Sequence, residues 1–148
     1  MLKSYHIVDH QLQINNGPLT DADIVILSDP HKKEQSTICR QFDLEPLTFQ
    51  FCNAPEEVAR FHQTPSTILN QPKLLVLYDF IPDRQRIEDQ LAPVILIWDA
   101  GHLILCTAAA TDCQNLLQEA VAQSTAPVDL VLALVNHWQD RLMDALLK

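Results

Sequence analysis

Glycine is scarce in this sequence, with only Gly17 and Gly101 among its 148 residues. Loops that cradle nucleotide phosphates need several glycines, because backbone amides must approach the phosphates without Cβ atoms in the way. The sequence has no Walker loop, no Gly-x-Gly-x-x-Gly fingerprint and no Gly-x-Ser-x-Gly nucleophile elbow. Nine prolines and several Asp and Asn residues punctuate the chain instead. The common nucleotide cradles and the serine-hydrolase elbow are therefore excluded.

Basic residues are also few: 10 Lys and Arg stand against 19 Asp and Glu, which gives a formal net charge of -9. Nucleic-acid binding needs a basic face, and docking on an anionic membrane surface needs basic clusters. This balance argues against both partners. An acidic chain suits a protein that meets cations, although many cytosolic proteins are acidic without such a role.

Long apolar runs are absent, and the longest, such as residues 94–98, fall far short of the roughly 20 residues of a membrane-spanning helix. The first residues show no apolar stretch behind a basic one, so no signal peptide is expected. Hydrophobic residues make up 47% and charged residues 20%, which is typical of a globular domain. We expect one soluble domain over residues 1–148.

Four cysteines are present, Cys39, Cys52, Cys106 and Cys113, and no two have the spacing of a zinc knuckle or a redox dithiol. Their neighbours are mostly apolar, so we expect reduced, mostly buried thiols in a cytosolic protein. Arg40 could lower the pKa of Cys39, but a thiol on a helix face is the favoured interpretation.

Titratable residues form no catalytic or metal-binding motif in the sequence. Six histidines are scattered without a His-Glu-x-x-His pair: His6, His10, His31, His62, His102 and His137. His31 and Glu34 are expected on a solvated first helical turn, His102 as an exposed hairpin residue and His137 on a helix surface. Four acidic residues lie close together in the sequence: Asp79, Asp83, Glu88 and Asp89. Such a cluster could attract Mg²⁺ loosely, although four solvated surface residues are the favoured interpretation.

The first half of the chain predicts a hairpin, a buried strand and two helices. Residues 2–8 and 11–14 flank a turn at Asp9 and His10, and residues 24–27 form a continuous apolar strand. Asp29 is expected to cap a helix over residues 30–42, with Pro30 at its first position. A second helix is expected from Asn53 to Gln63.

The second half predicts four strands followed by two helices. Strands are expected over residues 66–69, 73–81, 94–98 and 103–107, with Gly101 taking positive φ in the last hairpin turn. Thr111 and Asp112 should cap a helix to Gln123, and Pro127 should open a final helix with one apolar face. The result is an α/β domain with a mixed β-sheet and flanking helices, with residues 24–27, 74–78 and 94–98 as inner strands.

Four local patterns occur in an order that resembles one known family. They are the strand and Pro turn of residues 24–30 with the helix end of residues 39–47, Thr64-Pro65 before the strand of residues 74–80, the hairpin of residues 94–107, and the helical phrase of residues 130–142. Together they resemble the N-terminal cytoplasmic domain of CorA-type magnesium and cobalt transporters, over nearly the whole chain.

The resemblance implies a cytoplasmic regulatory domain of a divalent-cation transporter that performs no bond chemistry, so no enzyme activity is expected. It implies Mg²⁺ or Co²⁺ as the transported ion, no tightly bound cofactor, and as partners the protein's own transmembrane region and sister subunits of a homopentamer. Two acidic positions of the family's regulatory metal site match Phe51 and Asn136 here. Since neither side chain is a carboxylate, the metal site is not carried over.

Two other interpretations stay open from the residues alone. One is a stand-alone cytosolic binding or adaptor module that oligomerises through its last helix; the other is an α/β enzyme that uses the acidic group with Mg²⁺. The final helix reaches Lys148 without a stop signal and with its apolar pattern, through Leu146, still in phase. We therefore expect a truncated long helix, frayed at its last turn, and a fragment that is a monomer or a weak, non-pentameric oligomer.

Overall fold

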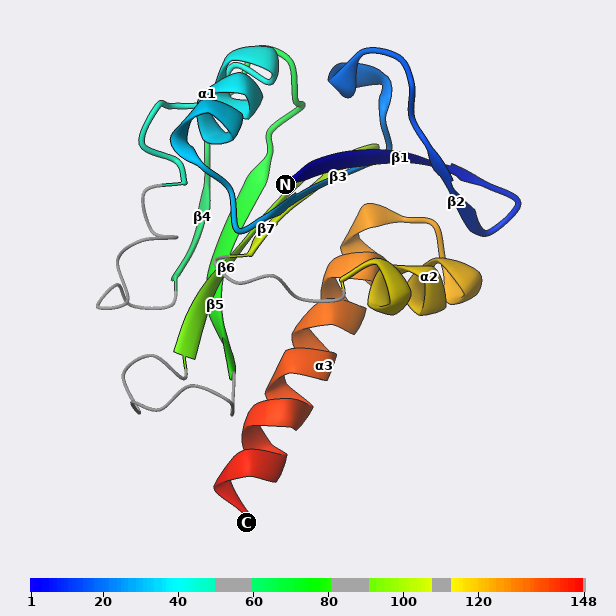
Figure 1. Cartoon of the computed structure of the whole chain (residues 1–148), viewed down its shortest axis with the longest axis vertical. Helices are drawn as coiled ribbons and strands as arrows, with labels where there is room; N and C mark the ends of the chain where they lie inside the picture. The colour runs from blue at the N-terminus through cyan, green and yellow to red at the C-terminus, as the bar shows by residue number, and fades with distance from the viewer. Residues whose placement is uncertain (50–59, 81–90, 108–112, 148) are drawn as a thin grey trace.

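The computed structural model describes residues 1–49, 60–80, 91–107 and 113–147. In these segments one seven-stranded sheet is covered by α1 (Lys32–Gln41) on one face and by α2 (Cys113–Gln123) and α3 (Pro127–Leu146) on the other. Figure 1 shows α3 running along the sheet and continuing past its lower edge to the C-terminus. The expected α/β architecture with flanking helices is confirmed.

The strand order across the sheet is β2-β1-β3-β7-β6-β5-β4. The strands are β1 (Leu2–Val8), β2 (Gln11–Ile14), β3 (Ile24–Ser28), β4 (Arg60–Gln63), β5 (Lys73–Phe80), β6 (Leu91–Trp98) and β7 (Leu103–Thr107). Strands β3 and β7 pair in parallel and the other described pairs are antiparallel, so the sheet is mixed as expected.

Two hydrophobic cores lie on the two faces of the sheet. On β3, Ile24 and Ile26 join the core under α2 and α3, whereas Val25 and Leu27 join the core under α1. This alternation follows from the two-residue period of a strand, and it explains why a continuous apolar run is required. Strands β3, β5 and β6 are all interior, which confirms the inner strands predicted from the sequence.

The turn between β1 and β2 is a two-residue hairpin turn, as the sequence predicts. Asp9 and His10 take left-handed conformations, with φ of 51° and 61°. Two successive left-handed residues match the right-handed twist of the flanking strands, and Asp tolerates this region better than most residues.

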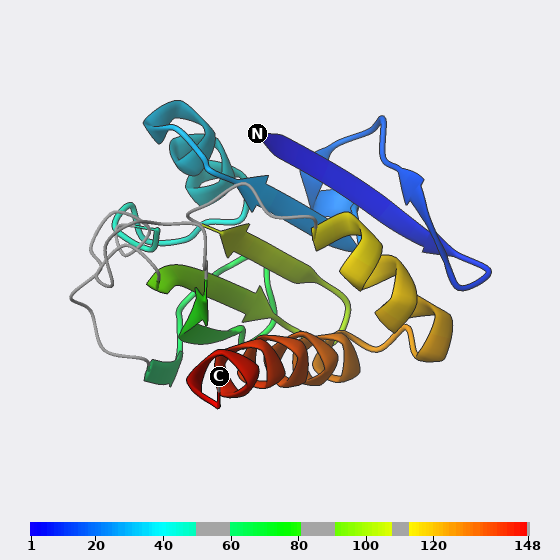
Figure 2. The same cartoon turned by 60° about the horizontal axis from the view of Figure 1, so that its bottom comes forward.

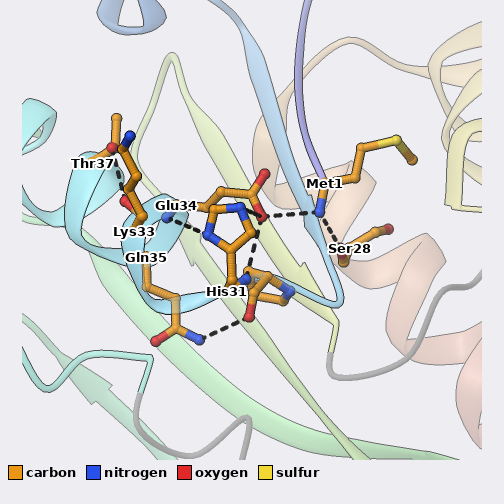
Figure 3. Close-up of polar contacts among 8 residues, drawn as sticks. Met1, Ser28, His31, Lys33, Glu34, Gln35 and Thr37 are labelled. Atoms are coloured by element: carbon orange, nitrogen blue, oxygen red, sulfur yellow. Dashed lines mark hydrogen bonds and ion pairs between the residues drawn. The ribbon is translucent and has the colours of Figure 1, made fainter.

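Helix α1 begins later than predicted, and Asp29 is not its cap. Asp29 is left-handed with φ 45°, and the N-cap is His31. His31 Nδ1 accepts from the Glu34 amide at 3.3 Å, and Glu34 Oε1 accepts from the His31 amide at 3.3 Å (Figure 3). This reciprocal capping box satisfies two amides at the helix start, which a cap at Asp29 with Pro30 following could not do.

Residues 60–69 also differ from the prediction. Residues 60–63, expected to end a helix, form strand β4 at the edge of the sheet, and residues 53–59 lie outside the described residues. Residues 66–69, expected as a strand, form a turn in which Ser66 Oγ accepts from the amides of Ile68 and Leu69 at 3.1 and 3.0 Å. These side-chain bonds replace the ladder bonds of a strand.

Candidate functional site

The described cysteines are buried thiols. Cys39, Cys106 and Cys113 are all free and buried, as expected, and Cys52 lies outside the described residues. Burial raises the pKa of the Cys39 thiol, which donates to the Glu45 carbonyl at 3.4 Å. A raised pKa disfavours the thiolate, so Cys39 is unsuited to be a nucleophile at neutral pH.

The histidines do not converge on a site. His31 caps α1, His10 contacts the Val121 carbonyl at 3.1 Å through Nδ1, and His137 is exposed on α3. His6 is half-buried on β1 and His62 is exposed on β4. Among the residues that the structure describes, no three His, Cys, Asp or Glu side chains are grouped in a way that could hold a metal ion.

Glu34 connects the start of α1 to the first residue of the chain. Its Oε1 lies 3.1 Å from the Met1 amino group and 3.3 Å from His31 Nε2 (Figure 3). The Met1 amino group also donates to the Ser28 carbonyl at 2.6 Å. Burial would raise the pKa of Glu34, but hydrogen bonds and charges from the amino group and His31 lower this pKa below its usual value. The cluster fastens β1 to α1.

The turn between β6 and β7 is organised by Asp99 and not by glycine flexibility. Gly101 does not take the positive φ expected for it. Asp99 accepts from the amides of Asn70 and Gly101 at 3.0 and 2.9 Å, and His102 Nδ1 lies 3.0 Å from it. His102, expected to be exposed, is half-buried, and its Nε2 faces the Thr20 carbonyl at 3.2 Å. Hydrogen bonds to the Asp99 carboxylate therefore hold the turn in place of the predicted glycine with positive φ.

Asp99 should make the stability of the domain depend on pH. Burial would raise the pKa of Asp99, but the two amide hydrogen bonds and His102 hold it below its usual value. A lowered folded-state pKa gives stability that is complete above the unfolded pKa of about 4 and is lost as the pH falls through the folded value. In thermal melts, Asp99→Asn should have a lower melting temperature than wild type at pH 7. The difference between the two melting temperatures should narrow below about pH 4.

Ala100→Ser in the same turn is the control for this pH series, because it changes no charge. Its difference from wild type should be independent of pH between about 3 and 7. A gap between Asp99→Asn and wild type that stays constant, or that widens in acid, would contradict the assigned role of the carboxylate.

Asp79 is buried, and the prediction of a solvated surface position for it is wrong. It was expected on a solvated surface, but it is 1% exposed on β5, and Asp83, Glu88 and Asp89 lie outside the described residues. Asp79 Oδ2 lies 3.5 Å from Arg141 Nη1 on α3. Sequence reasoning also missed Arg141, although the signal was present: Arg141 follows Leu134 and Trp138 on the buried side of the helix. The pair joins α3 to the sheet near the end of β5.

Helix α3 carries apolar residues on its exposed side as well as on its buried side. Leu130, Val131, Leu134 and Trp138 are buried in the core that α3 shares with α2 and the sheet. Its exposed apolar residues continue to its last residue: Val128, Leu132, Met143 and Leu146. The C-cap Leu147 is also exposed. Leu146 and Leu147 are 70% and 80% exposed, so they do not cover the sheet.

A pocket of about 550 Å³ lies at the start of α3, between the β1–β2 turn and the β6–β7 turn. His10, Asp23 and Pro127 are among its lining residues. Asp23 accepts from the Ile7 amide at 2.8 Å, and His10 is engaged with α2, so both polar groups hold the fold together. In the described segments, no helix combines the length and apolar character needed to cross a bilayer.

Comparison with known proteins gives a match in structure and not in sequence. No family model and no curated protein matches the sequence. The structure matches the ZntB cytoplasmic domain from Vibrio parahaemolyticus with a TM-score of 0.61 and 13% identity, and the full-length CmaX protein with a TM-score of 0.66 and 11% identity.

Both matches cover 97% of this chain, which spans 60% of the ZntB chain and 46% of the CmaX chain. The alignment therefore includes the sheet and the helices on both faces. The fold implied by the resemblance to CorA-type transporters is confirmed: the chain has the fold of the ZntB cytoplasmic domain.

Proposed function

We propose that residues 1–148 are the cytoplasmic regulatory domain of a CorA-like transporter of divalent metal cations, with Mg²⁺ or Co²⁺ as the transported ion. The observation that carries the assignment to a transporter domain is the ZntB-like fold over 97% of the chain, whereas the choice of Mg²⁺ or Co²⁺ rests on the sequence resemblance alone. The ordered CorA-like sequence patterns are a second and independent line of support. The domain performs no bond chemistry and acts through binding and conformational coupling.

Helix α3 is the element suited to coupling. One side is fixed to the sheet by Trp138 and by the Asp79–Arg141 pair, whereas the last turns extend past the sheet (Figure 1). A helix fixed at one end and projecting at the other transmits a rigid-body movement of the sheet along its axis. In the proposed transporter, the partners of α3 are the protein's own transmembrane region and sister subunits.

Metal flux tests the proposal directly. The full-length gene product, reconstituted in liposomes, should take up Mg²⁺ or Co²⁺ faster than empty liposomes, with Zn²⁺ as a third ion for comparison. Flux should stop when the transmembrane part is deleted. A natural stop codon after Lys148, or a reconstituted protein that carries none of the three ions, would favour the stand-alone adaptor instead.

The isolated domain should bind Mg²⁺ weakly or not at all at the position of the family's interface site. Asn136 is exposed on α3 and offers a neutral amide where a carboxylate would hold a hard cation. Phe51, the other matching position, lies outside the described residues and its side chain offers no ligand. Titration calorimetry with Mg²⁺ and Co²⁺ is the measurement. Micromolar binding that Asn136→Ala abolishes would contradict this prediction and restore a sensor role.

A further inference from the structure

Strand β2 forms one edge of the sheet, so one side of its backbone faces away from the other strands. In an antiparallel pair, alternate residues direct their amide and carbonyl groups toward the partner strand and away from it. The Asn15 amide bonds the Ser4 carbonyl of β1 at 2.9 Å, and this sets the alternation along the hairpin. The backbone groups of Leu12 and Ile14 therefore point outward, where a further strand could bond them.

The side chain of Gln118 on α2 occupies part of this outward side. The Leu12 amide donates to Gln118 Oε1 at 3.1 Å, and Gln118 Nε2 donates to the His10 carbonyl at 3.3 Å. One residue of a parallel neighbouring strand would accept and donate in the same two places. The opposite orientation of the side-chain amide would set donor against donor and acceptor against acceptor, so these partners fix its orientation.

Contacts on both sides of Gln118 hold α2 against the β1–β2 hairpin. One turn earlier on α2, Gln114 Oε1 accepts from the Tyr5 hydroxyl at 3.3 Å. Three residues after Gln118, the Val121 carbonyl lies 3.1 Å from His10 Nδ1. Figures 1 and 2 show α2 lying beside β1 and β2, with its axis across the end of the sheet that β2 closes. Gln118 is therefore held in position over the edge.

The sequence of β2 carries none of the usual protections of an edge strand. Residues 11–17 contain no charged residue and no proline. Ile14 is 72% exposed, so an apolar side chain lies open next to the outward backbone groups. Edge strands of monomeric proteins are usually protected by lysine, by proline or by a bulge, because an open edge pairs with other chains. Protection of β2 therefore depends on α2.

We propose that Gln118 closes the β2 edge to strand addition, and that β2 of a second copy pairs there when Gln118 is removed. Antiparallel pairing centred on Leu12 uses the same outward groups in both copies, so the edge is complementary to itself. In that register His10 lies opposite Ile14, and no two like charges meet. The Gln118 contacts and this pairing require the same Leu12 amide, so the two exclude one another.

Sedimentation velocity over a range of protein concentrations tests the proposal. The net charge of -9 opposes association, so the measurement is made in about 0.3 M NaCl, where exposed charges are screened. Gln118→Ala should self-associate at least about tenfold more tightly than wild type, because it frees the Leu12 amide and the His10 carbonyl. Gln123→Ala, the same substitution at an exposed position of α2, should stay within about twofold of wild type.

A proline at position 14 separates edge pairing from loss of the fold. The Ile14 amide points outward, so Ile14→Pro leaves the bonds between β1 and β2 intact and removes a donor that an added strand needs. The double variant Gln118→Ala/Ile14→Pro should return to the association of wild type. An added proline does not repair a misfolded protein, so this rescue identifies the β2 edge as the contact.

Hydrogen exchange of single amides gives a second readout in dilute protein. The Leu12 amide should exchange at least about tenfold faster in Gln118→Ala than in wild type, because its acceptor is gone. Three results would overturn the proposal: equal association of Gln118→Ala and Gln123→Ala, persistent association of the proline double variant, and unchanged exchange at Leu12. Metal flux enters none of these measurements, so this inference and the transporter proposal can fail separately.

Discussion

Val76→Asp is expected to abolish the folded domain. Val76 lies on the interior strand β5, is 0% exposed and packs in the core under α1 with Ile95 and Ile97. The substitution removes a buried apolar side chain and places a carboxylate where no water reaches it. The combined cost of about 5 kcal/mol or more is comparable to the whole stability of a typical domain, about 5–15 kcal/mol. Soluble yield and thermal melting measure the effect.

Lys73→Asp is the matched control for this substitution. Lys73 lies on the same strand and is exposed, so the new carboxylate keeps its water. Lys73→Asp should change the stability by less than about 1 kcal/mol. A soluble Val76→Asp protein with the melting temperature of wild type would contradict the placement of β5 in the interior of the sheet.

The interior of this fold was predictable because burial on two faces leaves a strong signal in the sequence. Residues 24–27, 74–78 and 94–98 are continuous apolar runs, and all three lie in interior strands. A strand exposed on one face would alternate apolar and polar residues instead. The final helix was predictable for a similar reason, because Pro127 marks its start and its apolar spacing persists for 20 residues.

Local polar structure was not predictable in the same way. Ser66 was expected in a strand but bonds neighbouring amides, and His31 caps α1 where Asp29 was expected to. In both places, nearby side chains can form alternative hydrogen bonds to backbone amides. The free energies of these alternatives differ by on the order of 1 kcal/mol or less. Tertiary contacts decide such cases: Ser66 also donates to the Phe42 carbonyl at 2.6 Å, 24 residues away.

The candidate site was predictable only in part, since its main features depend on two elements at once. The buried apolar face of α3 can be identified from spacing alone. The burial of Asp79 cannot, because nothing in residues 73–80 indicates that Arg141 will lie above the end of β5. A charged residue in an apolar strand reads as a surface position until its partner is known.

Arg141→Met is expected to destabilise the domain by about 3 kcal/mol, because it takes a guanidinium away from the buried Asp79 carboxylate. The Asp79 side chain is 2% exposed and that of Arg141 is 39% exposed, so the cost falls mainly on Asp79. Met keeps much of the apolar stem of Arg141, which limits the loss of packing. Urea unfolding of the purified domain, followed by the Trp98 and Trp138 fluorescence, gives the free energy of unfolding.

The double variant Asp79→Leu/Arg141→Met separates the charge from the packing. A leucine removes the buried carboxylate and adds apolar area between β5 and α3, so the double variant should lose less stability than Arg141→Met alone. Asp140→Asn, at an exposed α3 carboxylate, controls for net charge and should stay within about 0.5 kcal/mol of wild type. If the double variant lost as much as the sum of its single substitutions, the two groups would not be coupled. The Asp79–Arg141 pair would then not anchor α3, and the proposed coupling of the sheet to the projecting helix would rest on Trp138 and its apolar neighbours alone.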